Sequence, residues 1–164
     1  AYSESVRVAG DEANEAILRY LQRQRQMIVS EILAEKIKMK IGSAVPLDDP
    51  ETMEITGKEI LSGIPRTFVV TDEEIREAIK EPVMVIVDAV KRALEKTPPD
   101  LAADIHEKGY WLAGGGALIR GLDRLLNQVT GLKVNVAEDP LTAVARGAGM
   151  VIDQAEFFRQ VFIN

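Results

Sequence analysis

Three consecutive glycines, Gly114, Gly115 and Gly116, are the feature of this sequence that points most directly to chemistry. They follow the apolar segment 110–113, which is predicted as a buried strand, and they precede a predicted helix over 118–129. Glycines leave no Cβ to block a ligand, and a helix that begins there presents free N–H groups and the positive end of its dipole. Such a loop suits an anion or the flat face of a nucleotide. A tight strand-to-helix turn without any ligand explains the same glycines.

Several other kinds of site are excluded by residue type and spacing. No Lys-Ser or Lys-Thr follows the glycines, and their spacing is not GxGxxG, so the loop is neither a Walker A loop nor a dinucleotide fingerprint. The chain has no cysteine, which rules out disulfides, thiolate zinc sites and thiol nucleophiles. His106 is the only histidine, lies on a polar predicted helix and is expected at the surface. The residues therefore predict no catalytic group and no metal site.

The composition is that of a globular protein with a local excess of acid. The 164 residues carry a net charge of −6, and residues 43–74 hold eight Asp or Glu against two Lys or Arg. This distribution argues against a nucleic-acid surface, which needs a concentrated basic face. The longest apolar run, Val83 to Val87, falls far short of the roughly 20 residues of a membrane helix. The first residues lack the pattern of a targeting segment and do not begin with Met, so we expect a processed or excised fragment.

Two helices and three strands are predicted before residue 71. Residues 5–8 alternate and read as a short strand, and the apolar positions between Ala13 and Leu21 have helical spacing. A second helix is expected from Glu31 to Ile41, with Gly42 as its stop. On that helix Glu35 and Lys38 are neighbours three residues apart, a pattern typical of a surface ion pair. Residues 52–55 and 67–70 alternate and are expected to pair as antiparallel strands across breaks at Gly57 and 63–65.

The second half alternates helices with short strands. Thr71 and Glu74 match a capping box, and a helical pattern then runs to residue 96 with Pro82 inside it, which marks a candidate lobe boundary. The remaining predicted elements are a helix to residue 107, strands 110–113 and 133–136, the helix 118–129 and a final helix 141–158. Strands alternating with helices predict an α/β layer. The apolar end 157–163 fits a helix docked on the core or an exposed contact with a partner or a membrane.

Seven segments of the chain resemble the MreB family of bacterial actin homologues. They are 5–12 (SVRVAGDE), 34–38 (AEKIK), 41–44 (IGSA), 75–82 (IREAIKEP), 94–105 (LEKTPPDLAADI), 114–123 (GGGALIRGLD) and 136–145 (VAEDPLTAVA). The resemblance runs in order through nearly the whole chain. One segment departs from it, because Ser30-Glu31-Ile32-Leu33 stands where the family commonly has Gly-Glu-Arg-Thr.

The resemblance implies an actin-like ATPase fold of the α/β class, of which this chain looks like the C-terminal half. The base lobe of that half would comprise residues 1–9 and 83–164, and residues 10–82 would form an inserted, smaller α+β lobe. The family's two phosphate-binding loops would lie upstream of this segment.

Candidate cofactor-binding residues are also carried over from the family. Gly114, Gly115, Gly116 and Ala117 match its adenosine loop, and Ala34, Glu35 and Lys38 match the helix turn that lines the ribose and base. The cofactor implied is ATP with Mg²⁺ in the full-length protein. Glu35 and Lys38 would then share a nucleotide cleft with the glycines.

The function implied is that of a cytoskeletal filament subunit at the inner face of the bacterial membrane. Such a protein binds ATP, is a slow ATPase, polymerises with copies of itself and determines cell shape by positioning cell-wall synthesis. Its partners would be itself, cell-shape and wall-synthesis membrane proteins and the membrane surface, with no nucleic acid. This segment alone is expected to be inactive as an ATPase. Two alternatives remain open, a non-polymerising actin-like adaptor and an enzyme of the sugar-kinase or acetate-kinase type.

Overall fold

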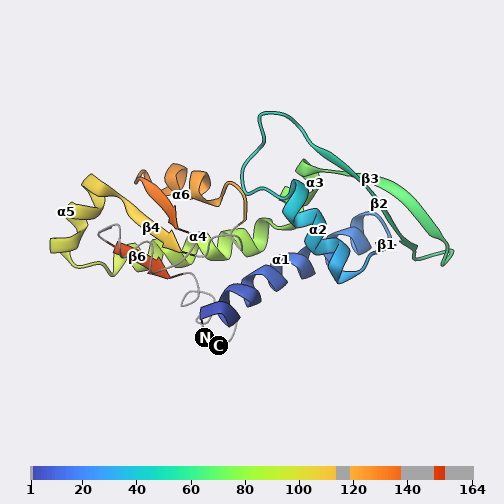
Figure 1. Cartoon of the computed structure of the whole chain (residues 1–164), viewed down its shortest axis with the longest axis horizontal. Helices are drawn as coiled ribbons and strands as arrows, with labels where there is room; N and C mark the ends of the chain where they lie inside the picture. The colour runs from blue at the N-terminus through green and yellow to red at the C-terminus, as the bar shows by residue number, and fades with distance from the viewer. Residues whose placement is uncertain (1, 114–118, 138–149, 154–164) are drawn as a thin grey trace.

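Two three-stranded sheets lie toward opposite ends of an elongated molecule, with helices between and around them (Figure 1). The computed structural model describes the backbone of residues 2–113, 119–137 and 150–153, and the side chains of 11–110 and 119–135. The described elements, in chain order, are α1 (Tyr2–Gln24), β1 (Met27–Ile28), α2 (Glu31–Ile41), β2 (Thr52–Glu59), β3 (Pro65–Thr71), α3 (Asp72–Ala78), α4 (Lys80–Glu95), α5 (Pro99–Lys108), β4 (Tyr110–Ala113), α6 (Leu122–Thr130), β5 (Val134–Ala137) and β6 (Met150–Asp153).

The first sheet is antiparallel, in the order β1-β2-β3. Strands β2 and β3 pair Thr52 with Thr71, which confirms the predicted antiparallel pair and extends both strands. Gly57 does not break β2 as expected. A Cβ at Gly57 would lie 2.9 Å from the carbonyl oxygen of Ile28, so this glycine lets β1 approach its partner closely. The two-residue strand β1 carries too short a pattern to be predicted.

The second sheet is parallel, in the order β5-β4-β6. Its central strand β4 covers the predicted range 110–113, and β5 begins and ends one residue later than the predicted 133–136. The predicted helix 141–158 is wrong at 150–153, where β6 pairs with β4. Apolar residues in a short buried run do not distinguish a parallel strand from a helix, which explains the error. The rest of that predicted helix lies outside the described residues.

Helix α1 is longer than the sequence indicates. The predicted strand 5–8 is wrong, because α1 runs through these residues without interruption. An alternation of only four residues is too short to separate a period of two from a period of 3.6, and one internal glycine, Gly10, weakens a helix without ending it. From residue 11 onward the predicted helical spacing is confirmed, since Ala13, Ile17 and Leu21 are fully buried.

The long helical pattern 71–96 is divided into two helices at Ile79. The Thr71 hydroxyl accepts a hydrogen bond from the Glu74 N–H at 3.1 Å, as the capping box predicts. The Glu74 carboxylate, however, lies 3.7 Å from Arg25 Nε, so the reciprocal half of the box is replaced by an ion pair to the end of α1. Pro82 sits in the first turn of α4, where a missing N–H costs little, so the break falls just before it.

Helix α6 begins at Leu122, four residues after the predicted start at 118. Gly121 precedes it with a φ of +80°, a left-handed conformation that does not continue a helix. The short helix predicted to residue 107 is confirmed as α5.

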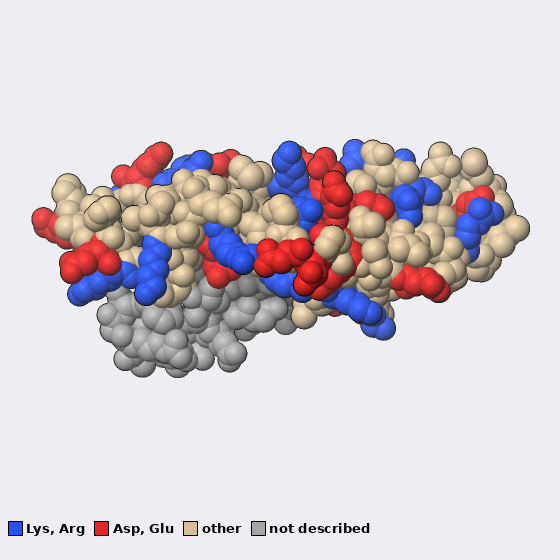
Figure 2. All heavy atoms as spheres, turned by 90° about the horizontal axis from the view of Figure 1, so that it is seen from above, with Lys and Arg blue, Asp and Glu red and all other residues tan. Residues whose placement is uncertain are grey.

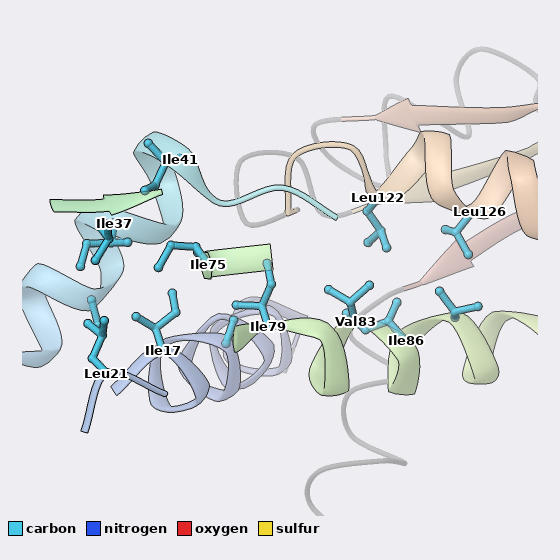
Figure 3. Packing of buried hydrophobic residues seen from close by; sticks show 14 of the residues in the cluster. Ile17, Leu21, Ile37, Ile41, Ile75, Ile79, Val83, Ile86, Leu122 and Leu126 are labelled. Atoms are coloured by element: carbon cyan, nitrogen blue, oxygen red, sulfur yellow. The ribbon is translucent and has the colours of Figure 1, made fainter. Parts of the chain in front are cut away.

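One hydrophobic cluster runs through the described core and joins the two ends of the molecule (Figure 3). Ile75 of α3 and Ile79, at the break between the helices, occupy the middle of this row. On one side of them lie Ile17, Leu21, Ile37 and Ile41, and on the other lie Val83, Ile86, Leu122 and Leu126. The predicted division into lobes, with 10–82 inserted between 1–9 and 83–164, stays a prediction. The hydrophobic cluster is continuous between the two sheets.

The charged surface is mixed. Figure 2 shows Asp and Glu side chains gathered near the middle of the long axis, while Lys and Arg side chains are dispersed over this face. Within the acid-rich stretch 43–74, one carboxylate is buried rather than exposed. Asp72, at the start of α3, is only 5% exposed.

Hydrogen bonds hold the buried Asp72 carboxylate in its charged form. Its two oxygens accept from the Glu51 N–H at 2.9 Å and from the Arg76 guanidinium at 3.1 Å. Burial alone raises the pKa of Asp72, but these hydrogen bonds and the charge of Arg76 outweigh burial and place the pKa below its ordinary value. The Asp72 N–H donates in turn to the Glu51 carbonyl at 2.9 Å. The segment before β2 is thereby fastened to the start of α3.

Asp72→Asn is expected to lower the free energy of unfolding at neutral pH by about 1.5–3 kcal/mol, since a charge-assisted hydrogen bond is lost. Because the folded pKa is depressed, the stabilisation is present above the unfolded pKa of about 3.9 and is lost as pH falls through the folded pKa. Urea unfolding of both proteins from about pH 7 to pH 3 measures this. Asp100→Asn, at an exposed first-turn position of α5, is the matched control. If the difference in the free energy of unfolding between Asp72→Asn and the parent protein stays constant over this pH range, the depressed pKa of Asp72 is contradicted.

Candidate functional site

Helix α2 carries three of the seven predicted site residues, and its ends are fixed by local hydrogen bonds. The Ser30 hydroxyl caps the helix by accepting from the Leu33 N–H at 3.1 Å. At the other end the Gly42 N–H donates to the Lys38 carbonyl at 2.9 Å. Gly42 has an ordinary φ of −71°, but a Cβ there would lie 2.4 Å from the Lys38 oxygen. The glycine is therefore needed for close approach rather than for a left-handed turn.

The three α2 residues differ in exposure. Ala34 is fully buried and belongs to the hydrophobic cluster. Glu35 is exposed and Lys38 is partly buried. Since residues three apart on a helix are neighbours, Glu35 and Lys38 lie on the same side of α2, next to the face that Ala34 packs into the core. The structure thus places the two charged residues together at the edge of the core.

A carboxylate of α1 completes a small charged group around Lys38. Burial lowers the pKa of Lys38, while the negative charges of Glu35 and Asp11 act in the opposite direction. Asp11 is exposed on α1, which packs against α2. A cation under the influence of carboxylates from two helices provides charged groups that can interact with the hydroxyl and amino groups of a polar ligand.

Asn14 is a further polar residue of this region that the sequence did not single out. It lies one helical turn after Asp11 on α1 and is only 3% exposed. Its Oδ1 finds no hydrogen-bond donor among the described residues. Leaving a buried amide oxygen unpaired costs about 1–3 kcal/mol, so such an atom is typical of a position that accepts a donor from a ligand or from water. In the sequence, the only sign of Asn14 is a polar residue next to Ala13, within the apolar helical pattern that continues to Ile17.

The four remaining predicted site residues, Gly114, Gly115, Gly116 and Ala117, lie outside the described residues, and their role stays a prediction. The structure does describe what precedes them. Strand β4 is the central strand of the parallel sheet and ends at Ala113. In open α/β sheets, ligands bind beyond the carboxyl ends of the strands. Strand β4 therefore ends at the edge of the sheet where such sites are found, and the glycines come next in the sequence.

Two pockets are found in the described part of the molecule near these elements. One, of about 580 Å³, lies beside α2 and is lined by Glu35, Lys36, Met39, Lys40 and Met53. Another, of about 600 Å³, is lined by residues that include Tyr20, Pro46, Arg76 and Leu125, and by none of the predicted site residues. Only the first therefore contacts the predicted site.

His106 is exposed on α5, as the sequence predicts. Within the described residues, no three or more His, Cys, Asp or Glu side chains are grouped so that they could hold a metal ion. No helix within the same residues is long and apolar enough to cross a membrane.

Comparison with known proteins gives consistent matches in sequence. The chain matches the family model of the MreB/Mbl protein over residues 1–160. It is 50% identical over 155 residues to the cell shape-determining protein MreB of Escherichia coli (strain K12), covering 94% of this chain and 45% of that protein. It is 42% identical over 154 residues to the cell shape-determining protein Mbl of Bacillus subtilis (strain 168), covering 94% and 46%. The chain thus spans less than half the length of these relatives.

Solved structures agree with this match. MreB 5 of Spiroplasma citri bound to AMPPNP superposes with a TM-score of 0.74 at 35% identity, covering 84% of this chain and 41% of that chain. The MamK double helical filament superposes with a TM-score of 0.63 at 21% identity, covering 85% and 42%, which shows a shared fold. The family match and the superposition confirm the α/β class and the actin-like fold expected from the sequence. The chain therefore belongs to the MreB/Mbl family and has an actin-like fold.

Proposed function

We propose that this chain is the nucleotide-binding C-terminal half of a bacterial actin-like protein that binds ATP and polymerises into filaments. The observation that carries the proposal is the co-linear match of 94% of the chain to a cell shape-determining protein at 50% identity. The filaments would lie at the cytoplasmic face of the inner membrane and determine cell shape by positioning cell-wall synthesis. The partners would be further copies of the protein, membrane proteins of cell shape and wall synthesis, and the membrane surface.

The proposed nucleotide site has one arm on α2 and one arm after β4. Glu35 and Lys38 would contact the ribose and base from α2, with Ala34 shaping the helix surface behind them. Gly114, Gly115, Gly116 and Ala117 would form the opposite arm as an adenosine loop. Support comes from the partly buried Lys38, which feels the negative charges of Glu35 and Asp11, and from the unpaired Oδ1 of Asn14, which suits a ligand hydroxyl or amino donor. A structural relative, MreB5 of Spiroplasma citri, has been solved with ADP and with AMPPNP.

Mg²⁺ would accompany ATP in the full-length protein. The described residues provide no cluster of carboxylates suited to hold that ion, so its ligands would come from other residues and from the phosphates. We propose that the two phosphate-binding loops belong to the N-terminal half. In this arrangement the present residues bind and orient the adenosine, and the chemistry at the γ-phosphate is carried out elsewhere.

Polymerisation is expected for the full-length protein when ATP and Mg²⁺ are present. Light scattering, with sedimentation of the products, measures it and separates the filament subunit from the other two candidate functions. A rise in scattering that requires ATP supports a filament subunit. No rise despite tight ATP binding supports the adaptor. Phosphoryl transfer to acetate or to a sugar would support the kinase.

Gly115→Val in the full-length protein is expected to weaken ATP binding more than Lys38→Ala does. A branched side chain would restrict the backbone and fill space that the nucleotide needs, two penalties of about 1–3 kcal/mol each. Lys38 contributes at most one charge-assisted hydrogen bond, about 1.5–3 kcal/mol and less where water has access. Titration of labelled ATP against the folded variants measures both. Lys91→Ala, which removes an exposed lysine from α4, is the control and should leave the affinity unchanged.

An equal or greater loss for Lys38→Ala would overturn this order. It would mean that the glycines form only a turn, and that α2 carries the binding energy.

The 164-residue chain on its own is expected not to hydrolyse ATP. Phosphoryl transfer needs metal and donor groups around the β- and γ-phosphates, and the proposed source of these groups is the other half of the protein. Phosphate release from the purified chain, compared with a sample without protein, measures this. Release above that background, and absent from a Lys38→Ala preparation, would refute the assignment of the phosphate loops.

A further inference from the structure

Residues just after α2 contact residues just before α6. We call this contact the clamp, formed by Ser43, Ala44 and Val45 on one side and by Arg120 and Gly121 on the other. The Ala44 N–H donates to the Arg120 carbonyl at 2.8 Å. Ser43 is fully buried, and its hydroxyl donates to the Val45 carbonyl at 2.7 Å, which fixes the turn that presents Val45. The clamp thus joins segments that are far apart in the sequence.

The clamp leaves no room for a side chain at residue 121. Gly121 has a φ of +80°, and a Cβ there would lie 2.8 Å from Val45 Cγ2 and 3.1 Å from Ser43 Oγ. Both neighbours are themselves buried, so neither can move away cheaply. Close packing at Gly121 therefore fixes the distance between the two segments.

Arg120 extends the clamp to the end of α2 itself. Its guanidinium donates to the Lys40 carbonyl in the last turn of α2 at 3.4 Å and to the Glu51 carboxylate at 3.0 Å. Glu51 is held in turn by Asp72, whose carboxylate accepts from the Glu51 N–H and whose N–H donates to the Glu51 carbonyl. Arg120 consequently connects α2, the segment before β2 and the start of α6.

The place of the clamp in the sequence links it to both arms of the proposed site. Ser43 follows the last residue of α2 by two positions, and Arg120 follows Ala117 by three. We infer that the clamp sets the position of α2 relative to β4 and α6, and that Arg120, Gly121 and Val45 are positioning residues for nucleotide binding. This inference rests on the proposed function, because it assigns the two ends of the clamp to the two arms of the same site.

Gly121→Ala tests the clamp, with Gly131→Ala as its matched control. Both glycines have a left-handed φ, +80° and +72°, and both flank α6. A Cβ at Gly131 meets nothing within 4 Å, so the pair separates the effect of backbone strain from the effect of the contact with Val45. In the full-length protein Gly121→Ala is expected to raise the Kd for ATP at least tenfold. Gly131→Ala is expected to lower the melting temperature but to keep the Kd within twofold.

A second substitution identifies the contact responsible. Val45→Ala removes the Cγ2 atom that a Cβ at residue 121 would meet, so the double variant Val45→Ala/Gly121→Ala is expected to recover most of the lost affinity. Equal ATP affinity of Gly121→Ala and Gly131→Ala would overturn the inference. Should Gly121→Ala fail to fold, Arg120→Ala replaces it. Its control is Arg66→Ala, which breaks a 2.8 Å ion pair to Glu59 within the first sheet.

A measurement without nucleotide keeps this inference separate from the proposed function. The chain has no cysteine, so Lys36→Cys on α2 and Gln128→Cys on α6, both exposed, provide sites for two spin labels after any cysteines elsewhere in the full-length protein are replaced. The distance distribution between the labels is expected to shift or broaden in Gly121→Ala and to stay unchanged in Gly131→Ala. An unchanged distribution in Gly121→Ala overturns the clamp even if ATP binds. If the parent protein binds no ATP, the proposed function fails, and the label distances alone decide whether the clamp positions α2.

Discussion

The buried carboxylate of Asp72 is the interaction on which the arrangement of the central loop depends. A charged group that is 5% exposed is tolerated only when its oxygens are hydrogen-bonded, and here the Glu51 N–H and the Arg76 guanidinium satisfy them. Arg76 also donates to the Val45 carbonyl at 3.4 Å. One carboxylate thus fixes both ends of the segment from Val45 to Glu51. Without it, the residues after α2 would lose their support from α3.

The hydrophobic cluster explains why so few polar contacts around Asp72 are sufficient. Ile75 and Ile79 lie where α3 meets α4, and apolar residues from α1, α2, α4 and α6 extend the packing in both directions (Figure 3). Burial of each such side chain is worth about 1.5–3 kcal/mol, whereas an exposed ion pair contributes about 0–1 kcal/mol. The cluster therefore supplies the stability that holds the two ends together. The polar contacts determine their relative position rather than the strength of their association.

Local patterns made much of the fold predictable. The cap at Thr71, the end of α2 at Gly42 and the apolar spacing of α1 and α4 depend on residues within one or two helical turns, and all were readable from the sequence. Predictions failed where a pattern was only a few residues long, as at 5–8 and 150–153, or where the partner was distant. The clamp between Val45 and Gly121 and the unpaired oxygen of Asn14 depend on tertiary packing, which periodicity does not encode. The glycines of the proposed site could be predicted because their residue type carries the signal by itself, and their role stays a prediction.

The two sheets also differ in the sequence separation between the strands that pair. In the antiparallel sheet, Lys58 pairs with Pro65 across a short turn, so this hairpin closes at a small cost in chain entropy. In the parallel sheet, Tyr110 pairs with Met150, and the intervening chain includes α6 and β5. Long-range parallel pairing is slow because loop closure must precede the contacts that reward it. The first sheet, complete by residue 71, can therefore fold during synthesis, before the last strand of the second sheet has left the ribosome.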